Sequence, residues 1–431
     1  MATQVKRPVI LDETGQRIAA GVAGIAKALQ RGSHTLYAFH INGNESDPSS
    51  MITYLEDATG LTAAKMNYTT GTFDWGSWKD AFFMPRPCMV RQAGGVDYYL
   101  DEDDYTKKED GTESDVANTD YEGNAMMEWG RDGKKIWYKI APDSGDTASA
   151  TIYIADEQLD DSYHAWSFIN NQGHYVDHFY TPIYNGSNIN SVMRSLSGQT
   201  ISGSLAGATE ITYALANNKD TNVCWYTEVF SDRQILTLLG YLMFKTTDLP
   251  GALGRGLDSG SQTALNAYKT GALDAMGLFY GYNDGSHGVK FFGMENWWAA
   301  QWRRTAGLIL SEGEVKVKLT YGTQDGSTTE GYNSDGSGYK SQGVTPSGSS
   351  GGYISKMHFS EDAMVSNVMS GSSSTYYCDG TWYNNSGARY ALFGGSSGNG
   401  LSCGPVYCNL NDGLSAASWA YGAALSYKPL G

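Results

Sequence analysis

Two cysteines, Cys403 and Cys408, are separated by four residues, a spacing at which two thiols could act together. Thiol chemistry depends on the thiolate, whose formation is favoured by neighbouring positive charge. The surrounding segment from Tyr390 to Tyr427 contains no Lys, Arg or His, and its only charged residue is Asp412. The sequence around the two cysteines is therefore unfavourable for thiolate catalysis.

Carboxylates and histidines offer two candidate metal sites. The run from Asp101 to Asp115 is rich in carboxylates, which calcium prefers, but its spacing matches no calcium-binding loop. His174 and His178 would share one face of a strand without a third ligand there. We expect a solvated acidic loop and packed or surface imidazoles, with no metal and no cofactor. Because the sequence also lacks the usual nucleophile, phosphate-loop and zinc-protease motifs, we expect no enzymatic activity.

The segment 390–427 has instead the composition of a binding surface. It combines Gly, Ser, Ala and Asn with Tyr, Leu, Val and Cys, and it holds a single tryptophan, Trp419. Small adaptable residues between rigid aromatic residues are typical of binding loops, whereas a hydrolase site would gather titratable groups. The composition of residues 390–427 therefore predicts a surface that binds a ligand without catalysing a reaction.

Three stretches of this segment, FGGSS, GPVYCNLN and SWAYGAALS, begin at Phe393, Gly404 and Ser418. They resemble the variable region of the target proteins of diversity-generating retroelements, many of which are phage tail receptor-binding proteins with a C-type-lectin-like fold. In that family an error-prone reverse transcriptase changes template adenines, mostly in Asn codons. Such changes never yield Lys, Glu, Gln, Met or Trp, which matches the segment apart from Trp419. The resemblance implies that Trp419 is a fixed and largely buried scaffold residue; a plain β-hairpin of small residues is the alternative interpretation.

A second resemblance lies within residues 288–307. Four positions match a box shared by lectin-like tail proteins and formylglycine-generating enzymes: Glu295, Asn296, Trp298 and Trp302. In that fold the box packs core aromatic residues, so we expect a core role, with a carbohydrate platform as the alternative. The related enzymes use two cysteines spaced like Cys403 and Cys408, which makes a copper oxidase a further candidate function, although their flanking Ser, Tyr and Arg pattern is missing here.

Charge and cysteine count restrict the class of protein. The 431 residues carry a formal net charge of −16, which disfavours nucleic acid and anionic membrane surfaces, because binding to either needs basic patches. No apolar run reaches membrane-spanning length, and the first residues lack the pattern of a secretory signal. Five cysteines without a dense framework are typical of a protein made in a reducing cytoplasm. We therefore expect no nucleic-acid partner and no membrane insertion.

The first 33 residues are expected to be a helical segment for attachment and oligomerisation. Ile18, Val22, Ile25 and Leu29 recur at heptad spacing, which indicates a seam between helices. The segment also resembles N-termini of phage tail proteins, which implies contacts with other tail proteins and a homotrimer. Packing of this helix on its own domain is the alternative.

The rest of the chain predicts an α+β protein with two further domains. Short alternating strands indicate a β-rich domain over 34–165, and the resemblance implies a C-type-lectin-like ligand-binding domain over 166–431, with its variable region at about 390–427. Within this second domain, Ser231–Phe244 predicts a helix capped by Ser231. Its apolar face consists of Ile235, Leu238, Leu239, Leu242 and Met243. A later strand should point Val315, Val317 and Leu319 inward.

The predicted ligand contacts are residue types reachable from an Asn codon, together with two aromatic residues directly before the variable stretch as rim or floor: Ser397, Asn399, Leu401, Ser402, Val406, Tyr407, Cys408, Asp412, Ala416, Ser418, Ala420, Trp382 and Tyr383. Gly394, Gly395 and Gly422 should be fixed by positive φ or close backbone approach. The expected protein is a receptor-binding adhesin of a phage tail, made in the host cytoplasm and displayed on the virion, where it contacts a host cell-surface protein or glycan. The alternative is a bacterial cell-surface or pilus-tip adhesin of the same fold.

Overall fold

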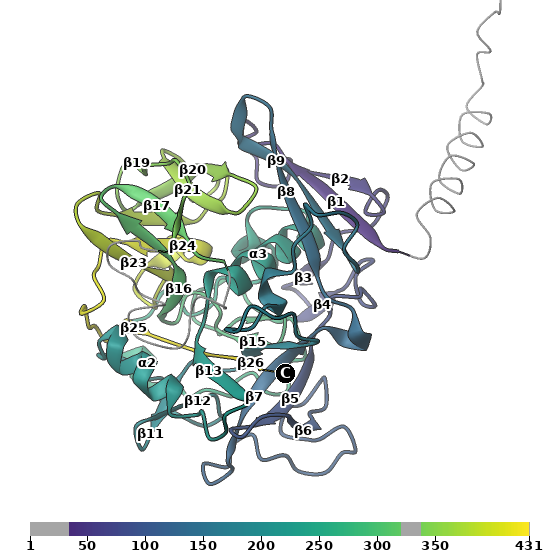
Figure 1. Cartoon of the computed structure of the whole chain (residues 1–431), viewed down its shortest axis with the longest axis vertical. Coiled ribbons are helices and arrows are strands. Elements are labelled where there is room, and N and C mark those ends of the chain that lie inside the picture. Colours follow the sequence, from purple (N-terminus) through teal and green to yellow (C-terminus); the bar gives the residue numbers. More distant parts are fainter. Residues whose placement is uncertain (1–33, 320–337, 431) are drawn as a thin grey trace, which may run out of the picture.

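The computed structural model describes residues 34–319 and 338–430, and all structural statements refer to these residues. The chain is β-rich with few helices, at 37% strand and 12% helix. Figure 1 shows helix α3 (Phe230–Phe244) near the centre of the molecule, with three sheets arranged around it. The expected helical segment over residues 1–33, with its heptad positions, lies outside the described residues.

The first sheet is formed by the N-terminal part of the described chain. Its four antiparallel strands run in the order β2-β1-β9-β8. Their bounds are β1 (Leu36–Ile41), β2 (Ile52–Glu56), β8 (Trp137–Asp143) and β9 (Asp146–Ala155). Ala150, Ile152 and Ile154 alternate along β9 and are buried, which is the period-two pattern of a strand with one face on the core.

The second sheet combines strands from distant parts of the sequence. Its order is β13-β26-β10-β7-β5-β6. The bounds are β5 (Arg86–Arg91), β6 (Val96–Tyr99), β7 (Gly123–Trp129), β10 (Phe179–Pro182), β13 (Val223–Thr227) and β26 (Leu425–Pro429). This sheet crosses the predicted boundary between 34–165 and 166–431, and so does the largest hydrophobic cluster, which runs from Phe39 to Ala420. The two predicted domains therefore share one core.

The third sheet carries the predicted variable region. Its strands run in the order β18-β17-β16-β23-β24-β22-β20-β21-β19, and β25 pairs with β16. The bounds are β16 (Trp302–Ser311), β17 (Glu314–Val317), β18 (Lys340–Ser341), β19 (Ser347–Gly348), β20 (Gly352–Phe359), β21 (Met364–Met369), β22 (Gly380–Tyr383), β23 (Ala388–Gly394), β24 (Gly404–Leu410) and β25 (Tyr421–Gly422). Val315, Val317 and Leu319 are buried, so the predicted inward face is confirmed.

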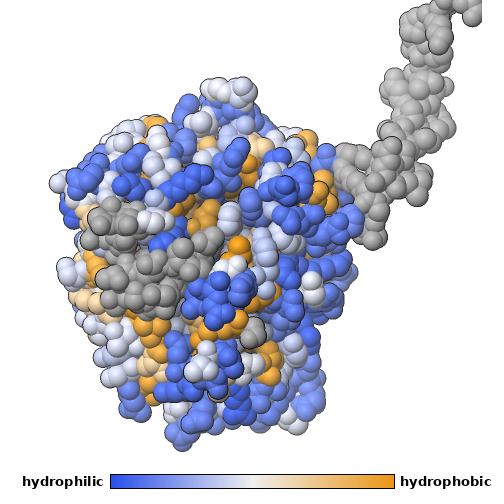
Figure 2. Space-filling model, in the orientation of Figure 1, coloured by the Kyte–Doolittle hydropathy of each residue, from blue (hydrophilic) through white to orange (hydrophobic). Residues whose placement is uncertain are grey.

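Short elements complete the described chain. Three two-stranded hairpins are formed by β3 (Lys65–Asn67) with β4 (Thr72–Asp74), β11 (Ser187–Ile189) with β12 (Val192–Arg194), and β14 (Lys290–Phe291) with β15 (Met294–Glu295). The remaining helices are η1 (Arg131–Gly133), η2 (Trp166–Phe168), α2 (Gly207–Leu215), α4 (Leu249–Leu253), α5 (Gln262–Ala267) and η4 (Gly400–Ser402). Figure 2 shows that the face in this view is mostly hydrophilic, with hydrophobic residues in small scattered groups.

Helix α3 confirms the predicted helix but differs from it in two respects. All fifteen of its residues are buried, because sheets surround it, whereas the sequence predicts one apolar face. The predicted cap is also wrong: the helix begins at Phe230, and Val229 is the N-cap residue without a side-chain cap. At the other end, Lys245 adopts the left-handed conformation that closes many helices.

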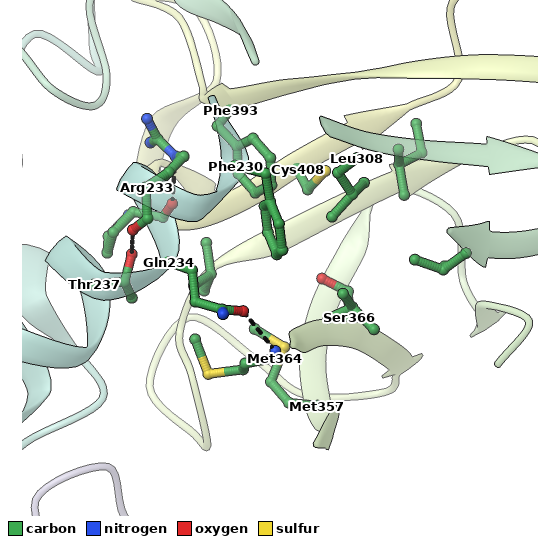
Figure 3. A pocket seen from close by; sticks show the side chains of 15 residues that line it. Phe230, Arg233, Gln234, Thr237, Leu308, Met357, Met364, Ser366, Phe393 and Cys408 are labelled. Atoms are coloured by element: carbon green, nitrogen blue, oxygen red, sulfur yellow. Dashed lines mark hydrogen bonds between the residues drawn. The ribbon is translucent and has the colours of Figure 1, made fainter. Parts of the chain in front are cut away.

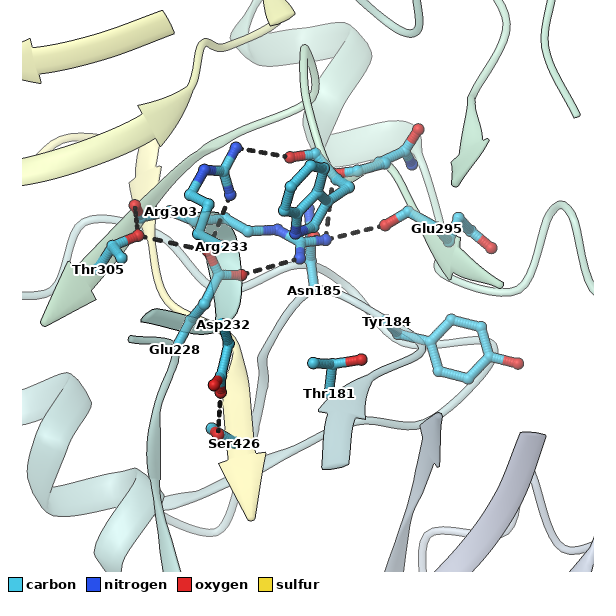
Figure 4. Close-up of polar contacts among 12 residues, drawn as sticks. Thr181, Tyr184, Asn185, Glu228, Asp232, Arg233, Glu295, Arg303, Thr305 and Ser426 are labelled. Atoms are coloured by element: carbon cyan, nitrogen blue, oxygen red, sulfur yellow. Dashed lines mark hydrogen bonds and ion pairs between the residues drawn. The ribbon is translucent and has the colours of Figure 1, made fainter. Parts of the chain in front are cut away.

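Buried charges connect α3 to the neighbouring strands (Figure 4). Glu228 accepts a hydrogen bond of 2.8 Å from Arg233 and lies 3.5 Å from the guanidinium of Arg303. Asp232 lies 3.2 Å from the ammonium of Lys428 on β26. Buried charges persist when they are paired and hydrogen-bonded. The network therefore fixes α3 against both the second and the third sheet.

Candidate functional site

The four positions of residues 288–307 that match the shared box belong to the core. They are between 0% and 3% exposed: Glu295, Asn296, Trp298 and Trp302. Trp297 is also buried, and Arg233 lies over its ring at 4.2 Å. The core prediction is confirmed, and a carbohydrate platform built from this box is wrong.

The predicted variable segment forms most of β23, all of β24 and β25 and part of β26, joined by two loops and the two-residue connection 423–424. Gly394 and Gly395 have φ values of 95° and 84°, in the region that favours glycine. A Cβ on Gly422 would lie 2.0 Å from Oε1 of Gln301. The predicted constraints on these three glycines are therefore confirmed. Trp419 is partly buried and packs beside two hydrophobic clusters; its role as a fixed scaffold residue stays a prediction.

Five predicted contact residues are buried and cannot meet a ligand directly: Ser397, Val406, Tyr407, Cys408 and Ala420, which are between 1% and 8% exposed. The prediction of surface positions is wrong for these five. For Val406, Tyr407 and Cys408 the physical reason is that both faces of β24 are covered. Phe230 of α3 packs in the same cluster as Cys408, while the ring of Trp302 lies 4.4 Å from that of Tyr407 on the opposite face.

Val406 and Cys408 line an internal cavity between α3 and the third sheet (Figure 3). Gln234 of α3 faces it and accepts a hydrogen bond of 2.9 Å from the backbone N–H of Met364. The free volume of the cavity is about 20 Å³, enough for about one water molecule. The cavity is therefore a packing gap and is too small for a receptor group.

The exposed part of the predicted site gathers around Trp382, which is 40% exposed. Leu401 is 51% exposed, and Tyr383, Asn399 and Ser402 are half-buried. We call these five residues the Trp382 patch. It consists of Trp382 and Tyr383, consecutive residues of β22 whose side chains alternate across the strand, and of the short loop between β23 and β24, which includes η4.

Tyr407 is the floor of the Trp382 patch. Its hydroxyl accepts a hydrogen bond of 2.8 Å from the indole N–H of Trp382. Burial is the main cause that raises the pKa of the Tyr407 hydroxyl. Hydrogen bonds with Trp382 and Ser402 lower this pKa and offset part of the rise. Gly351 also lies close to the indole, because a Cβ there would be 2.6 Å from the ring. The indole is therefore held in place while much of its surface stays exposed.

Internal hydrogen bonds fix the loop of the Trp382 patch. Oδ1 of Asn399 accepts from the backbone N–H and the hydroxyl of Ser396, both at 2.8 Å. The N–H of Gly400 donates to the carbonyl of Asp258 at 2.9 Å. Beside this loop lies a hollow of about 160 Å³ between residues 257–265 and 285–286, which Ser397 also lines. The side-chain oxygen of Asn399 thus accepts hydrogen bonds within the loop. Leu401 and Trp382 are the exposed apolar residues of the Trp382 patch.

The loop between β24 and β25 carries the other three predicted residues. Asp412 accepts hydrogen bonds from Asn409 at 2.8 Å and from Tyr421 at 2.7 Å. Asn409 is the register partner of Trp382, so this group adjoins the Trp382 patch. Ala416 and Ser418 are half-buried, and their carbonyls accept from Arg304 and Ser204. The predicted contacts omit Asn409 and Tyr421, although both residue types are among those typical of the segment 390–427.

The thiols and histidines belong to no metal-binding group in the described part of the chain. Burial raises the pKa of both Cys403 and Cys408, and the two residues belong to different hydrophobic clusters. Strand β10 begins only at Phe179, so the strand expected over His174 and His178 is wrong. Across residues 34–319 and 338–430, no group of three His, Cys, Asp or Glu side chains could hold a metal ion.

Comparison with protein-family models finds no match, and comparison with curated proteins finds none either. In the described part of the chain, no helix has the length and apolar character needed to cross a membrane.

Proposed function

We propose that the chain is a receptor-binding protein that contacts a host cell-surface protein or glycan through the Trp382 patch. Residues 166–431 are in this proposal C-type-lectin-like, residues 390–427 are diversified by a retroelement, and the protein is displayed as a homotrimer on a phage tail. The observation that carries the proposal is the arrangement of Trp382, whose indole is fixed by Tyr407 and yet 40% exposed.

The chemistry of the patch favours recognition over catalysis. Its five residues are Trp, Tyr, Asn, Leu and Ser, none of which titrates near neutral pH. Binding needs a complementary surface, and tryptophan and tyrosine are enriched among residues that dominate interface energies. A fixed aromatic ring also loses little conformational entropy on binding.

A bacterial cell-surface or pilus-tip adhesin would use the same patch and remains the alternative function. The patch serves either protein equally, so the site of display distinguishes them: antibody labelling of virions supports the tail adhesin, and labelling of uninfected bacteria supports the alternative. We do not extend the proposal to a copper oxidase, because burial raises the pKa of the thiols of Cys403 and Cys408, which disfavours thiolate ligands.

The proposal is tested by adsorption of the purified intact chain to host cells. We expect Leu401→Asp and Trp382→Ala each to reduce adsorption at least about tenfold, the effect of losing roughly 1.4 kcal/mol of binding free energy. Leu159→Asp is the matched control, since Leu159 is also an exposed leucine, at 36%, outside the patch. Melting temperatures should stay close to that of the unmodified chain. Unchanged adsorption of both patch variants would refute the proposal.

A further inference from the structure

A second hollow lies in segments that contribute nothing to the Trp382 patch. Its volume is about 370 Å³, within the range of roughly 300–1,000 Å³ typical of small-molecule sites. It is enclosed by the chain after β4, by Glu102 and by η1. We call it the Trp75 cleft.

Two aromatic rings provide the apolar part of the Trp75 cleft. Trp75 and Phe82 are both half-buried, so part of each ring faces solvent. Trp75 packs edge-on against Phe279 at 5.4 Å, and Phe82 stacks on Tyr37 at 6.0 Å with an interplanar angle of 8°. Packing therefore holds both rings in place before any ligand arrives.

The rim of the Trp75 cleft is charged but balanced in sign. Three cationic and three acidic side chains line it: Lys79, Arg131, Lys134, Asp80, Glu102 and Asp132. Two cations are paired, since Arg131 lies 3.3 Å from Glu102 and Lys134 lies 2.9 Å from Asp156 outside the cleft. Lys79, Asp80 and Asp132 are exposed, and no hydrogen bond or ion pair joins their side chains to another described residue. The cleft thus presents both donors and acceptors that are free to meet a ligand.

The backbone under Asp132 is held in an uncommon conformation. Its φ is 57°, and the flanking Gly130 and Gly133 have φ values of 105° and 75°. Non-glycine residues seldom adopt positive φ, and such residues occur often at functional sites. The turn places the carboxylate of Asp132 on the rim of the Trp75 cleft.

We propose that the Trp75 cleft binds a neutral saccharide of one or two rings. Sugar hydroxyls both donate and accept hydrogen bonds, so they match a rim that carries ammonium and carboxylate groups together. The apolar face of a sugar ring suits the exposed parts of Trp75 and Phe82. A phosphate or another anion is disfavoured, because the unpaired charged side chains of the rim are one ammonium, Lys79, and two carboxylates, Asp80 and Asp132. This inference is independent of the proposed role of the Trp382 patch.

The test is saturation-transfer NMR on the intact chain. The probes are the methyl glycosides of glucose, galactose, mannose and N-acetylglucosamine, together with lactose and maltose, at millimolar concentration. We expect at least one probe to bind. The double variant Asp80→Asn with Asp132→Asn should weaken this binding at least tenfold, and Trp75→Ala should do the same. Asp120→Asn with Asp161→Asn is the matched control, because both of these aspartates are exposed and lie outside the cleft; it should bind normally.

Four other results would contradict the saccharide proposal or part of it. Failure of every probe to bind, or full binding by the Asp80 and Asp132 double variant, overturns the proposal. Binding of inorganic phosphate or of free glycine in place of the sugars overturns the assignment of a neutral saccharide. Loss of sugar binding in Trp382→Ala would move the site to the Trp382 patch, whereas the inference requires that this variant bind normally. Thermal melting of Trp75→Ala separates lost binding from lost folding. Should Trp75→Ala prove unfolded, the Asp80→Asn with Asp132→Asn variant tests the proposal in its place.

Discussion

The indole N–H of Trp382 donates a 2.8 Å hydrogen bond to the hydroxyl of Tyr407, although Trp382 is 40% exposed and Tyr407 only 2%. One partner therefore faces solvent while the other belongs to the core. A change in the core beneath Tyr407 would shift the exposed indole, and a change at Trp382 leaves most of the core intact. Binding and stability can thus be separated by experiment at this pair.

Gly351 offers a way to move the indole without replacing it. In Gly351→Ala the new Cβ would lie 2.6 Å from the ring of Trp382, so the ring must shift and adsorption to host cells should fall. Gly343→Ala is the matched control, because Gly343 also has positive φ but a Cβ there would meet no described atom within 4 Å. Both variants should lose about 1–2 kcal/mol of stability from the left-handed backbone. Equal adsorption of the two variants would show that the position of the indole does not matter.

Glu228 should be among the most sensitive buried residues. Glu228→Gln leaves Arg233 and Arg303 without their charged partner in the core, since their guanidinium groups lie 2.8 and 3.5 Å from its carboxylate. Breaking a buried pair in this way costs about 3–5 kcal/mol, measured as the free energy of unfolding in denaturant. Glu361→Gln, at an exposed position, should change it by less than about 0.5 kcal/mol. A similar small loss in Glu228→Gln would contradict the structural role of the network.

The raised pKa of Glu210, a buried residue of α2, should make the free energy of unfolding depend on pH. Burial raises the pKa of its carboxyl to about 7 from the ordinary 4.5, and Arg304 offsets only part of this. Between these values the folded state keeps a proton that the unfolded state releases, so the free energy of unfolding should fall as pH rises from 4.5 to 7. In Glu210→Gln this fall should become shallower, as measured by denaturant titrations at several pH values. Glu361→Gln should keep the original slope; the same slope in Glu210→Gln would refute the assignment.

The proposed homotrimer is tested by light scattering of the intact chain at micromolar concentration. We expect a mass three times that of one chain, because the heptad spacing of Ile18, Val22, Ile25 and Leu29 indicates a helical seam. Three linked copies would strengthen weak single contacts, since later contacts become intramolecular. Deletion of residues 1–32 should reduce the mass to that of one chain. A monomer before deletion contradicts the trimer.

Local patterns in the sequence predict some elements well. The apolar spacing of 231–244 predicts α3, and the alternation of Val315, Val317 and Leu319 predicts one strand face, because each pattern needs only neighbouring residues. The glycine constraints at 394 and 395 are equally local. These features are confirmed because no distant segment is needed to specify them.

The burial of β24 could not be predicted in the same way. The composition of 404–410 fits both an exposed binding strand and a strand covered on both faces. The choice is made by Phe230 and Trp302, which lie about a hundred residues or more earlier in the chain and cover opposite faces. The Trp75 cleft depends similarly on segments near residues 80, 102, 132 and 278. Such arrangements follow from long-range packing, which single-sequence patterns do not encode.

Strand β26 lies between β10 and β13 in the second sheet, so strands synthesised early must wait for residues 425–429 before that sheet can close. A ribosome has to translate the whole segment 390–424 first. A premature stop or frameshift there removes β26 and leaves the facing edges of β10 and β13 unpaired, which exposes the chain to aggregation and proteolysis. If the segment is rewritten as proposed, only variants translated in frame through residues 425–429 would fold. The fold would therefore eliminate variants that carry a stop codon or a frameshift.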